Sequence, residues 1–136
     1  MKFRFVRDLT SDVVFEAFGK DKKELFENAA LAMFSVICQI RRVEPLMRKD
    51  VSVEGENLKD LMFNWLQALI GMVDVENVFL SKFQVTEMDD NHIKAFVYGE
   101  DADPGKGETV VKGVTYYKFG VEKTDDGYKA TVSLDI

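Results

Sequence analysis

The first part of the chain changes from a two-residue repeat of hydrophobic positions to a helical one. Hydrophobic and polar residues largely alternate over residues 3–7 and 13–18, which predicts two β-strands joined by a short connection. From Asp21 to about Ile37 the hydrophobic residues recur three and four positions apart, as they do on the buried face of an amphipathic helix. Asp21 with Glu24 three residues later resembles a capping box, so we expect the helix to begin there.

The middle of the chain predicts a second helix after a short strand. Residues 51–55 alternate in polarity, and Asn57 then provides an N-cap for a helix that runs to about Val73, with Gly71 near its end. Beyond this point the helical repeat disappears, and turn residues separate short alternating segments. These segments are predicted strands at residues 79–88, 93–98, 110–119 and 128–134. The second half is therefore expected to be an antiparallel meander.

This order of elements predicts one α+β domain that spans residues 1–136. Strands come first, two amphipathic helices follow, and a run of strands ends the chain. We expect a two-layer architecture in which both helices pack on one face of a mostly antiparallel sheet. A chain of 136 residues is long enough to bury one core and too short for two independent domains.

Composition and charge narrow the classes of function. The chain is 46% hydrophobic with 2 prolines and 9 glycines, which excludes disordered and collagen-like proteins. Its formal net charge of -6 opposes a phosphate backbone, so direct nucleic-acid binding is not expected. The N-terminus does not resemble a signal peptide, and no apolar stretch is long enough for a membrane span. Because a single cysteine cannot form an intramolecular disulfide, we expect a cytoplasmic protein.

Residue types that often carry catalysis are scarce. His92 is the one histidine, so neither a histidine triad nor an all-histidine metal site can form, and we interpret it as a surface residue. Cys38 lies in an apolar helical run, where burial raises a thiol pKa, and is interpreted as a core residue. The glycine- and carboxylate-rich loop at residues 99–108 matches neither the EF-hand nor the P-loop pattern. It is open to three interpretations: an acidic hairpin loop, a loop that docks a partner, or a metal-binding loop.

Carboxylates at two strand ends form a candidate metal site. Asp12 closes the first strand region, and Asp135 and Ile136 end the last one. If these strands pair, two aspartate carboxylates and the terminal α-carboxylate converge, and a cation between them would relieve their repulsion. Calcium and magnesium prefer such oxygen ligands. The alternative is that both aspartates are ordinary solvated residues near strand ends.

Several segments are distinctive in combination and cover nearly the whole chain. The strongest are Leu-Phe-Glu-Asn-Ala-Ala-Leu-Ala at residues 25–32 and Asn-Trp-Leu at residues 64–66. Further segments lie at residues 8–13, 17–20, 53–58, 61–63, 95–100, 103–104, 111–117 and 131–136. Together they resemble the archease family, small proteins that assist RtcB-type tRNA-splicing RNA ligases. Leu9, Gly107 and Tyr117 stand where that family usually has histidine.

The resemblance implies a metal site and candidate contacts with a partner. Archeases bind a divalent cation through residues that match Asp12, Asp135 and Ile136 here; calcium is the expected ion, with magnesium and manganese as alternatives. Lys112 matches the lysine of a Val-Lys-x-Val-Thr-Tyr motif. It is a candidate for contacting a nucleotide phosphate or a ligase carboxylate, and an ordinary surface salt bridge is the alternative. Asp103, in the Asp-Pro motif, is a further candidate for such contacts.

The resemblance also implies the function. The chain is expected to be an accessory protein, not an enzyme, that promotes guanylylation and repeated turnover of an RtcB-type RNA ligase. No obligate small-molecule substrate is expected. Two alternatives stay open from the residues themselves. One is a general chaperone or protein-interaction module with a structural carboxylate cluster, and the other is a small metal-dependent hydrolase, for which no convincing general base is present.

Overall fold

The computed structural model describes residues 1–7 and 12–136, which form two α-helices, seven strands and two short 3-10 helices. In chain order the elements are β1 (Phe3–Val6), β2 (Val13–Gly19), α1 (Lys22–Ile37), η1 (Ile40–Arg42), β3 (Met47–Glu54), α2 (Leu58–Glu76), β4 (Val78–Met88), β5 (His92–Asp101), η2 (Pro104–Lys106), β6 (Gly113–Thr124) and β7 (Gly127–Asp135).

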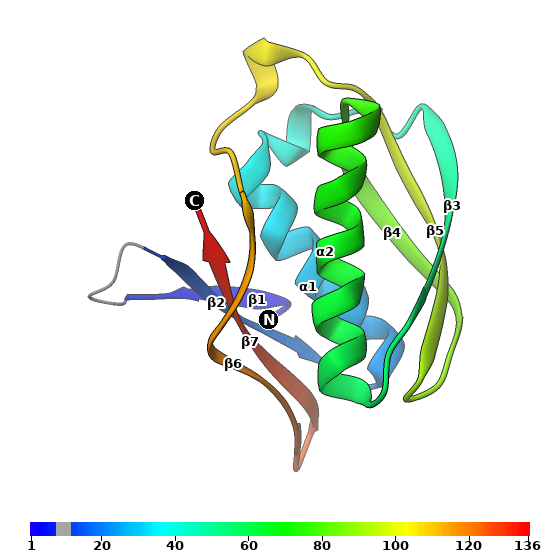
Figure 1. Ribbon diagram of the computed structural model, residues 1–136, viewed down its shortest axis with the longest axis vertical. Coiled ribbons are helices and arrows are strands. Elements are labelled where there is room, and N and C mark those ends of the chain that lie inside the picture. Colours follow the sequence, from blue (N-terminus) through cyan, green and yellow to red (C-terminus); the bar gives the residue numbers. More distant parts are fainter. Residues whose placement is uncertain (8–11) are drawn as a thin grey trace.

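The described strands form two antiparallel sheets around the helices. One sheet has the order β1-β2-β7-β6 and the other the order β3-β5-β4. In Figure 1 the helices lie in the middle, with β3, β4 and β5 on one side and the other sheet on the opposite side. Accordingly, α1 contacts β2 and β4, and α2 contacts β6 and β3. The α+β class with antiparallel strands is confirmed, whereas one sheet with both helices on one face is corrected to two sheets.

Strand β3 is the reason for the second sheet. It begins earlier than the predicted strand at residues 51–55 and pairs with β5 along its whole length, from Met47 opposite Gly99 to Glu54 opposite His92. The other side of β5 pairs with β4. The β4–β5 hairpin therefore joins β3 instead of continuing into β6 and β7, as a simple meander would.

Both helices begin at the residues that the sequence predicts. The side chain of Asp21 accepts a hydrogen bond from Glu24 N–H over 2.8 Å, and that of Asn57 accepts one from Asp60 N–H over 2.9 Å. Gly71 does not mark the end of α2, which continues past the predicted end near Val73 to a C-cap at Asn77, whose φ of 54° is left-handed. No helix in the described part of the chain is long and apolar enough to cross a membrane.

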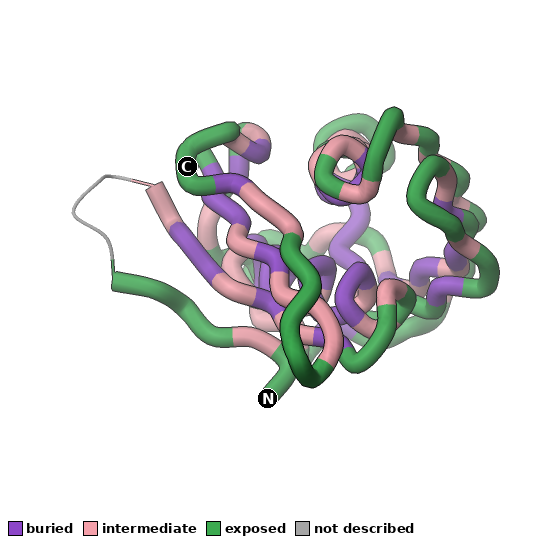
Figure 2. Tube along the Cα trace, turned by 90° about the horizontal axis from the view of Figure 1, so that it is seen from below, coloured by how far each residue is buried: buried purple, intermediate pink, exposed green. Residues whose placement is uncertain are grey.

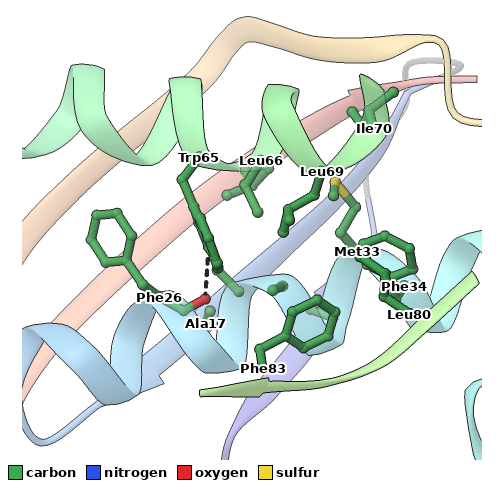
Figure 3. Close-up of a cluster of buried hydrophobic side chains, with 14 of the residues drawn as sticks. Ala17, Phe26, Met33, Phe34, Trp65, Leu66, Leu69, Ile70, Leu80 and Phe83 are labelled. Carbon is green, nitrogen blue, oxygen red and sulfur yellow. Dashed lines mark hydrogen bonds between the residues drawn. The ribbon is translucent and has the colours of Figure 1, made fainter. Parts of the chain in front are cut away.

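The core lies where the two helices face each other and the sheets. Trp65 is fully buried, and its Nε1–H donates a hydrogen bond to the Phe26 carbonyl over 3.1 Å, which joins α2 to α1 (Figure 3). Phe34 of α1 packs against Phe83 of β4, with ring centroids 5.3 Å apart. The other buried residues of α2 are Leu61, Met62, Leu66, Leu69 and Ile70. Helix packing therefore holds both sheets in place.

Strand β6 contains a large bulge. Its residues 116–119 oppose a single residue of β7, Val132. Lys118 has a left-handed φ of 52° within the bulge. Tyr116 stacks on Phe63 of α2, with ring centroids 4.4 Å apart and planes inclined by 6°. The bulge thus separates the regular β6–β7 pairing at the C-terminal end of β7 from the pairing near the turn.

Candidate functional site

The paired strands β2 and β7 bring the two predicted aspartates to the same end of their sheet. Val13 pairs with Leu134 in antiparallel register, so one further step sets Asp12 opposite Asp135. Ser133 Oγ–H donates a hydrogen bond to Asp12 Oδ2 over 3.1 Å. The condition for the candidate site, that these two strands pair, is therefore met.

The chain terminus and Lys112 lie beside the same strand end. Lys112 N–H donates a hydrogen bond to the Asp135 carbonyl over 2.7 Å, and Gly113 pairs with Asp135 in the β6–β7 ladder. Ile136 follows directly and is 41% exposed. Figure 2 shows the C-terminal end in the colour of exposed residues. A ligand or a partner can therefore reach this end of β7 from solvent.

All of the predicted donors at this end are oxygen atoms. They belong to the side-chain carboxylates of Asp12 and Asp135 and to the main-chain carboxylate expected at Ile136. Within residues 1–7 and 12–136, no group of three or more His, Cys, Asp or Glu side chains could hold a metal ion, and this set contains only two such side chains. Carboxylates without a nitrogen or sulfur donor suit a hard cation such as calcium or magnesium. The donor chemistry therefore fits the implied cation.

Two hydroxyl groups, on Ser133 and Thr115, lie beside these strand ends. Ser133 is fully buried, and Thr115 of β6 lies directly opposite it in the register. The Thr115 Oγ1 atom is buried and has no hydrogen-bond partner among the described residues. Sequence reasoning missed both, although alternation along residues 131–135 places Ser133 and Asp135 on one face of the strand.

Asp103 lies in a different part of the molecule. It is the N-cap of η2, where its Oδ1 accepts a hydrogen bond from Gly105 N–H over 2.9 Å. In the same loop Lys106 Nζ lies 2.8 Å from Glu100 Oε1, and this hydrogen bond holds the pKa of Glu100 below its usual value. Figure 1 places the loop at the top, apart from the C-terminus. The structure does not bring Asp103 to the strand-end carboxylates, and these contacts favour a structural role for the loop.

His92 and Cys38 occupy the positions that the sequence predicts. His92 lies at the surface, with Nε2 3.1 Å from Glu87 Oε1 and Nδ1 3.4 Å from Asp89 Oδ1. Cys38 is 1% exposed, and its Sγ–H donates a hydrogen bond to a carbonyl of α1. Burial, with a smaller contribution from Glu108, raises the pKa of Cys38 to about 12. A thiol with this pKa is not a nucleophile near neutral pH.

The three departures from the family histidines fall in different surroundings. Leu9 lies outside the described residues. Gly107 forms an isolated β-bridge with Cys38 near the end of α1. Tyr117 lies in the β6 bulge, is 39% exposed and has the Lys118 ammonium 5.3 Å from its ring centroid. Of the two described positions, Tyr117 is the closer along the chain to the Lys112 motif.

Comparison with known proteins shows which family this chain matches. The model of the Archease protein family (MTH1598/TM1083) matches residues 3–136. The protein archease of Methanosarcina acetivorans is 39% identical over 133 residues, which cover 93% of this chain and 91% of that protein. The protein archease of Sulfurisphaera tokodaii is 36% identical over 138 residues, which cover 99% of each chain.

Solved structures agree with the sequence matches. The solution structure of Methanobacterium thermoautotrophicum protein 1598 is similar with a TM-score of 0.84 and 35% identity, covering 99% of each chain. A Thermotoga maritima protein described as "an archease, possible chaperone" has a TM-score of 0.70 and 19% identity, covering 98% of this chain and 97% of that one, and this likeness concerns the fold alone. From the matched family model and the relatives above 30% identity, the chain belongs to the archease family.

Proposed function

We propose that this archease holds a divalent cation through Asp12, Asp135 and the terminal carboxylate of Ile136, with calcium as the first candidate and magnesium or manganese as alternatives. The observation that carries the proposal is the β2–β7 register, which sets the aspartates opposite each other beside the chain terminus. Like charges at one strand end repel one another, and a cation bound among them removes that repulsion. When bound, the ion supplies a positive charge at a solvent-accessible edge that is otherwise acidic.

The partner that we propose is an RtcB-type RNA ligase in the cytoplasm. The archease acts on it as an accessory protein, promoting guanylylation and repeated turnover without catalysing a reaction itself. Family membership supports this role, and the net charge of -6 favours contact with a basic protein surface over contact with RNA. Lys112 is exposed beside Asp135 and is the residue that we assign to a partner phosphate or carboxylate.

A chaperone role is the second candidate, and one surface feature favours it. Tyr116 is 71% exposed and Val110 is 78% exposed, so apolar area is available to an unfolded client. The Thermotoga maritima relative is also described as a possible chaperone. This role requires suppression of aggregation of unrelated proteins, which light scattering measures directly.

The deciding experiment counts ligated RNA per molecule of cognate RtcB-type ligase, with GTP and a divalent cation present. Four reactions are compared: no addition, wild type, Asp12→Asn and Asp125→Asn. Asp125 is an exposed carboxylate in the β6–β7 connection and serves as the matched control for the loss of one negative charge. We expect wild type and Asp125→Asn to convert a single-turnover ligase into a multiple-turnover one, and Asp12→Asn to fail. If wild type leaves turnover unchanged, the ligase role is refuted and the chaperone role takes its place.

A further inference from the structure

Two hydroxyl groups, on Ser133 and Thr115, lie beside the strand-end carboxylates, and the family resemblance assigns neither a role. Along β7, Ala130, Val132 and Leu134 belong to the hydrophobic core. Because side chains alternate along a strand, Ser133 and Asp135 point to the opposite face, away from the helices. Ser133 is nevertheless fully buried on that face. A buried hydroxyl on the face opposite the core needs a specific partner.

Ser133 has such a partner in Asp12. Its Oγ–H donates to Asp12 Oδ2 over 3.1 Å, across the β2–β7 pairing. A hydrogen bond to a carboxylate oxygen fixes the side-chain rotation of the aspartate. Ser133 is therefore placed to orient a carboxylate that we assign to the cation.

Thr115 lies on the other side of β7. It pairs directly with Ser133, and Asp135 lies two residues further along β7 on the same face. The Thr115 Oγ1 atom is buried and lacks a hydrogen-bond partner within the described residues. Leaving a buried hydroxyl unpaired costs free energy, so native structures usually supply a partner from protein, water or ligand. The unpaired oxygen lies diagonally across from a carboxylate of the proposed site.

We propose that two hydroxyls belong to the cation site: Ser133 is a positioning residue that holds the Asp12 carboxylate in its binding orientation, and Thr115 supplies a further ligand oxygen. This inference rests on the cation site proposed above. Residues that orient metal ligands contribute strongly to affinity, and their removal costs about 10-fold to 100-fold in metal binding. The two hydroxyls are therefore expected to affect calcium affinity without themselves carrying charge.

The test is calorimetric titration of chelator-treated full-length protein with calcium chloride. Ser133→Ala and Thr115→Val each remove one of the two hydroxyls. Thr115→Ser keeps a hydroxyl at its position and removes only the methyl group. Thr131→Val is the matched control, because Thr131 lies on the same face of β7 but further from Asp135. We expect the calcium Kd to rise about 10-fold in Ser133→Ala and in Thr115→Val. Thr115→Ser and Thr131→Val should bind like wild type.

Thermal unfolding without calcium separates this role from a merely structural one. Removing an unpaired buried hydroxyl does not weaken the fold, so Thr115→Val should unfold without calcium at or above the wild-type temperature. Wild-type calcium affinity in both hydroxyl-deleting variants would overturn the inference and leave the cation site standing. If wild type itself binds no calcium, magnesium or manganese, the proposed cation site fails and the inference fails with it.

Discussion

Replacing Trp65 by Phe tests whether the contact between α1 and α2 supports the fold as the structure indicates. Trp65 is 0% exposed, and Figure 3 shows its indole reaching from α2 to the carbonyl of Phe26 on α1. Phenylalanine keeps an aromatic ring at the same position but loses the Nε1–H donor and part of the buried volume. The Phe26 carbonyl lies inside α1 and keeps its helical hydrogen bond.

The expected loss of stability has two parts, of which the lost packing is the larger. The missing hydrogen bond costs about 1 kcal/mol, since its acceptor stays paired within the helix. The smaller ring buries less apolar surface and leaves a void of roughly 40 Å³, which together cost about 2 kcal/mol. The free energy of unfolding should therefore fall by about 3 kcal/mol, and for a chain of this length the Tm should fall by roughly 10 °C.

Urea unfolding followed by far-UV circular dichroism is the suitable assay. Trp65 is the only tryptophan, so tryptophan fluorescence would be lost with the substitution. Tyr116→Phe is the control, because it removes a hydroxyl from an exposed ring and should change stability by less than about 0.5 kcal/mol. A loss below about 1 kcal/mol in Trp65→Phe would refute the reasoning, since it would not exceed the hydrogen bond alone.

Three further outcomes follow from the loop, the thiol and the chain terminus. Lys106→Met removes the ion pair that lowers the pKa of Glu100, so it should lower the Tm at pH 7. The stabilisation by a lowered carboxyl pKa is lost as the pH falls through that pKa, so the difference in Tm from wild type should shrink below pH 4.5. Calorimetry at pH 7 and at a pH below 4.5 measures both differences. Cys38 should resist an aromatic disulfide reagent at pH 8 in the native protein and react fully in denaturant, and rapid native labelling would contradict its pKa of about 12. A Gly-Ser extension after Ile136 moves the terminal carboxylate, so it should weaken calcium binding in titration, whereas the same extension at the N-terminus should not.

The helices were predictable because their signals are local. Hydrophobic spacing and the Asp21 and Asn57 caps lie within a few residues of the structure that they specify. The first part of β3 lacked a clear pattern for a physical reason. Lys49 is only partly exposed and pairs with Glu76 of α2 over 2.8 Å, so a charged residue occupies a position that faces the helix. The division into two sheets depends on which strand β3 pairs with, and alternation along one strand does not encode its partner.

The candidate site was likewise predictable from the sequence only in part. The sequence shows that Asp12 and Asp135 lie at the ends of two strands. The structure adds that these two strands are neighbours in one sheet. Finding Ser133 and Thr115 requires the register of three strands at once, together with the knowledge that one hydroxyl is paired and the other is not. The bulge at residues 116–119 hides the relation further, because it breaks the alternation of β6 just after Thr115.

Core packing sets the direction in which the proposed ligands point. Val13 packs against the core and Leu134 is buried within it, opposite each other in the β2–β7 ladder. A shift of either strand by one residue would turn its hydrophobic side chain away from the core and turn its aspartate toward the helices. The burial of two hydrophobic residues therefore selects the register in which Asp12 and Asp135 share the outer face. A substitution that loosens this pair, such as Leu134→Ala, is expected to weaken calcium binding without altering any ligand, because the carboxylates lose the frame that aligns them.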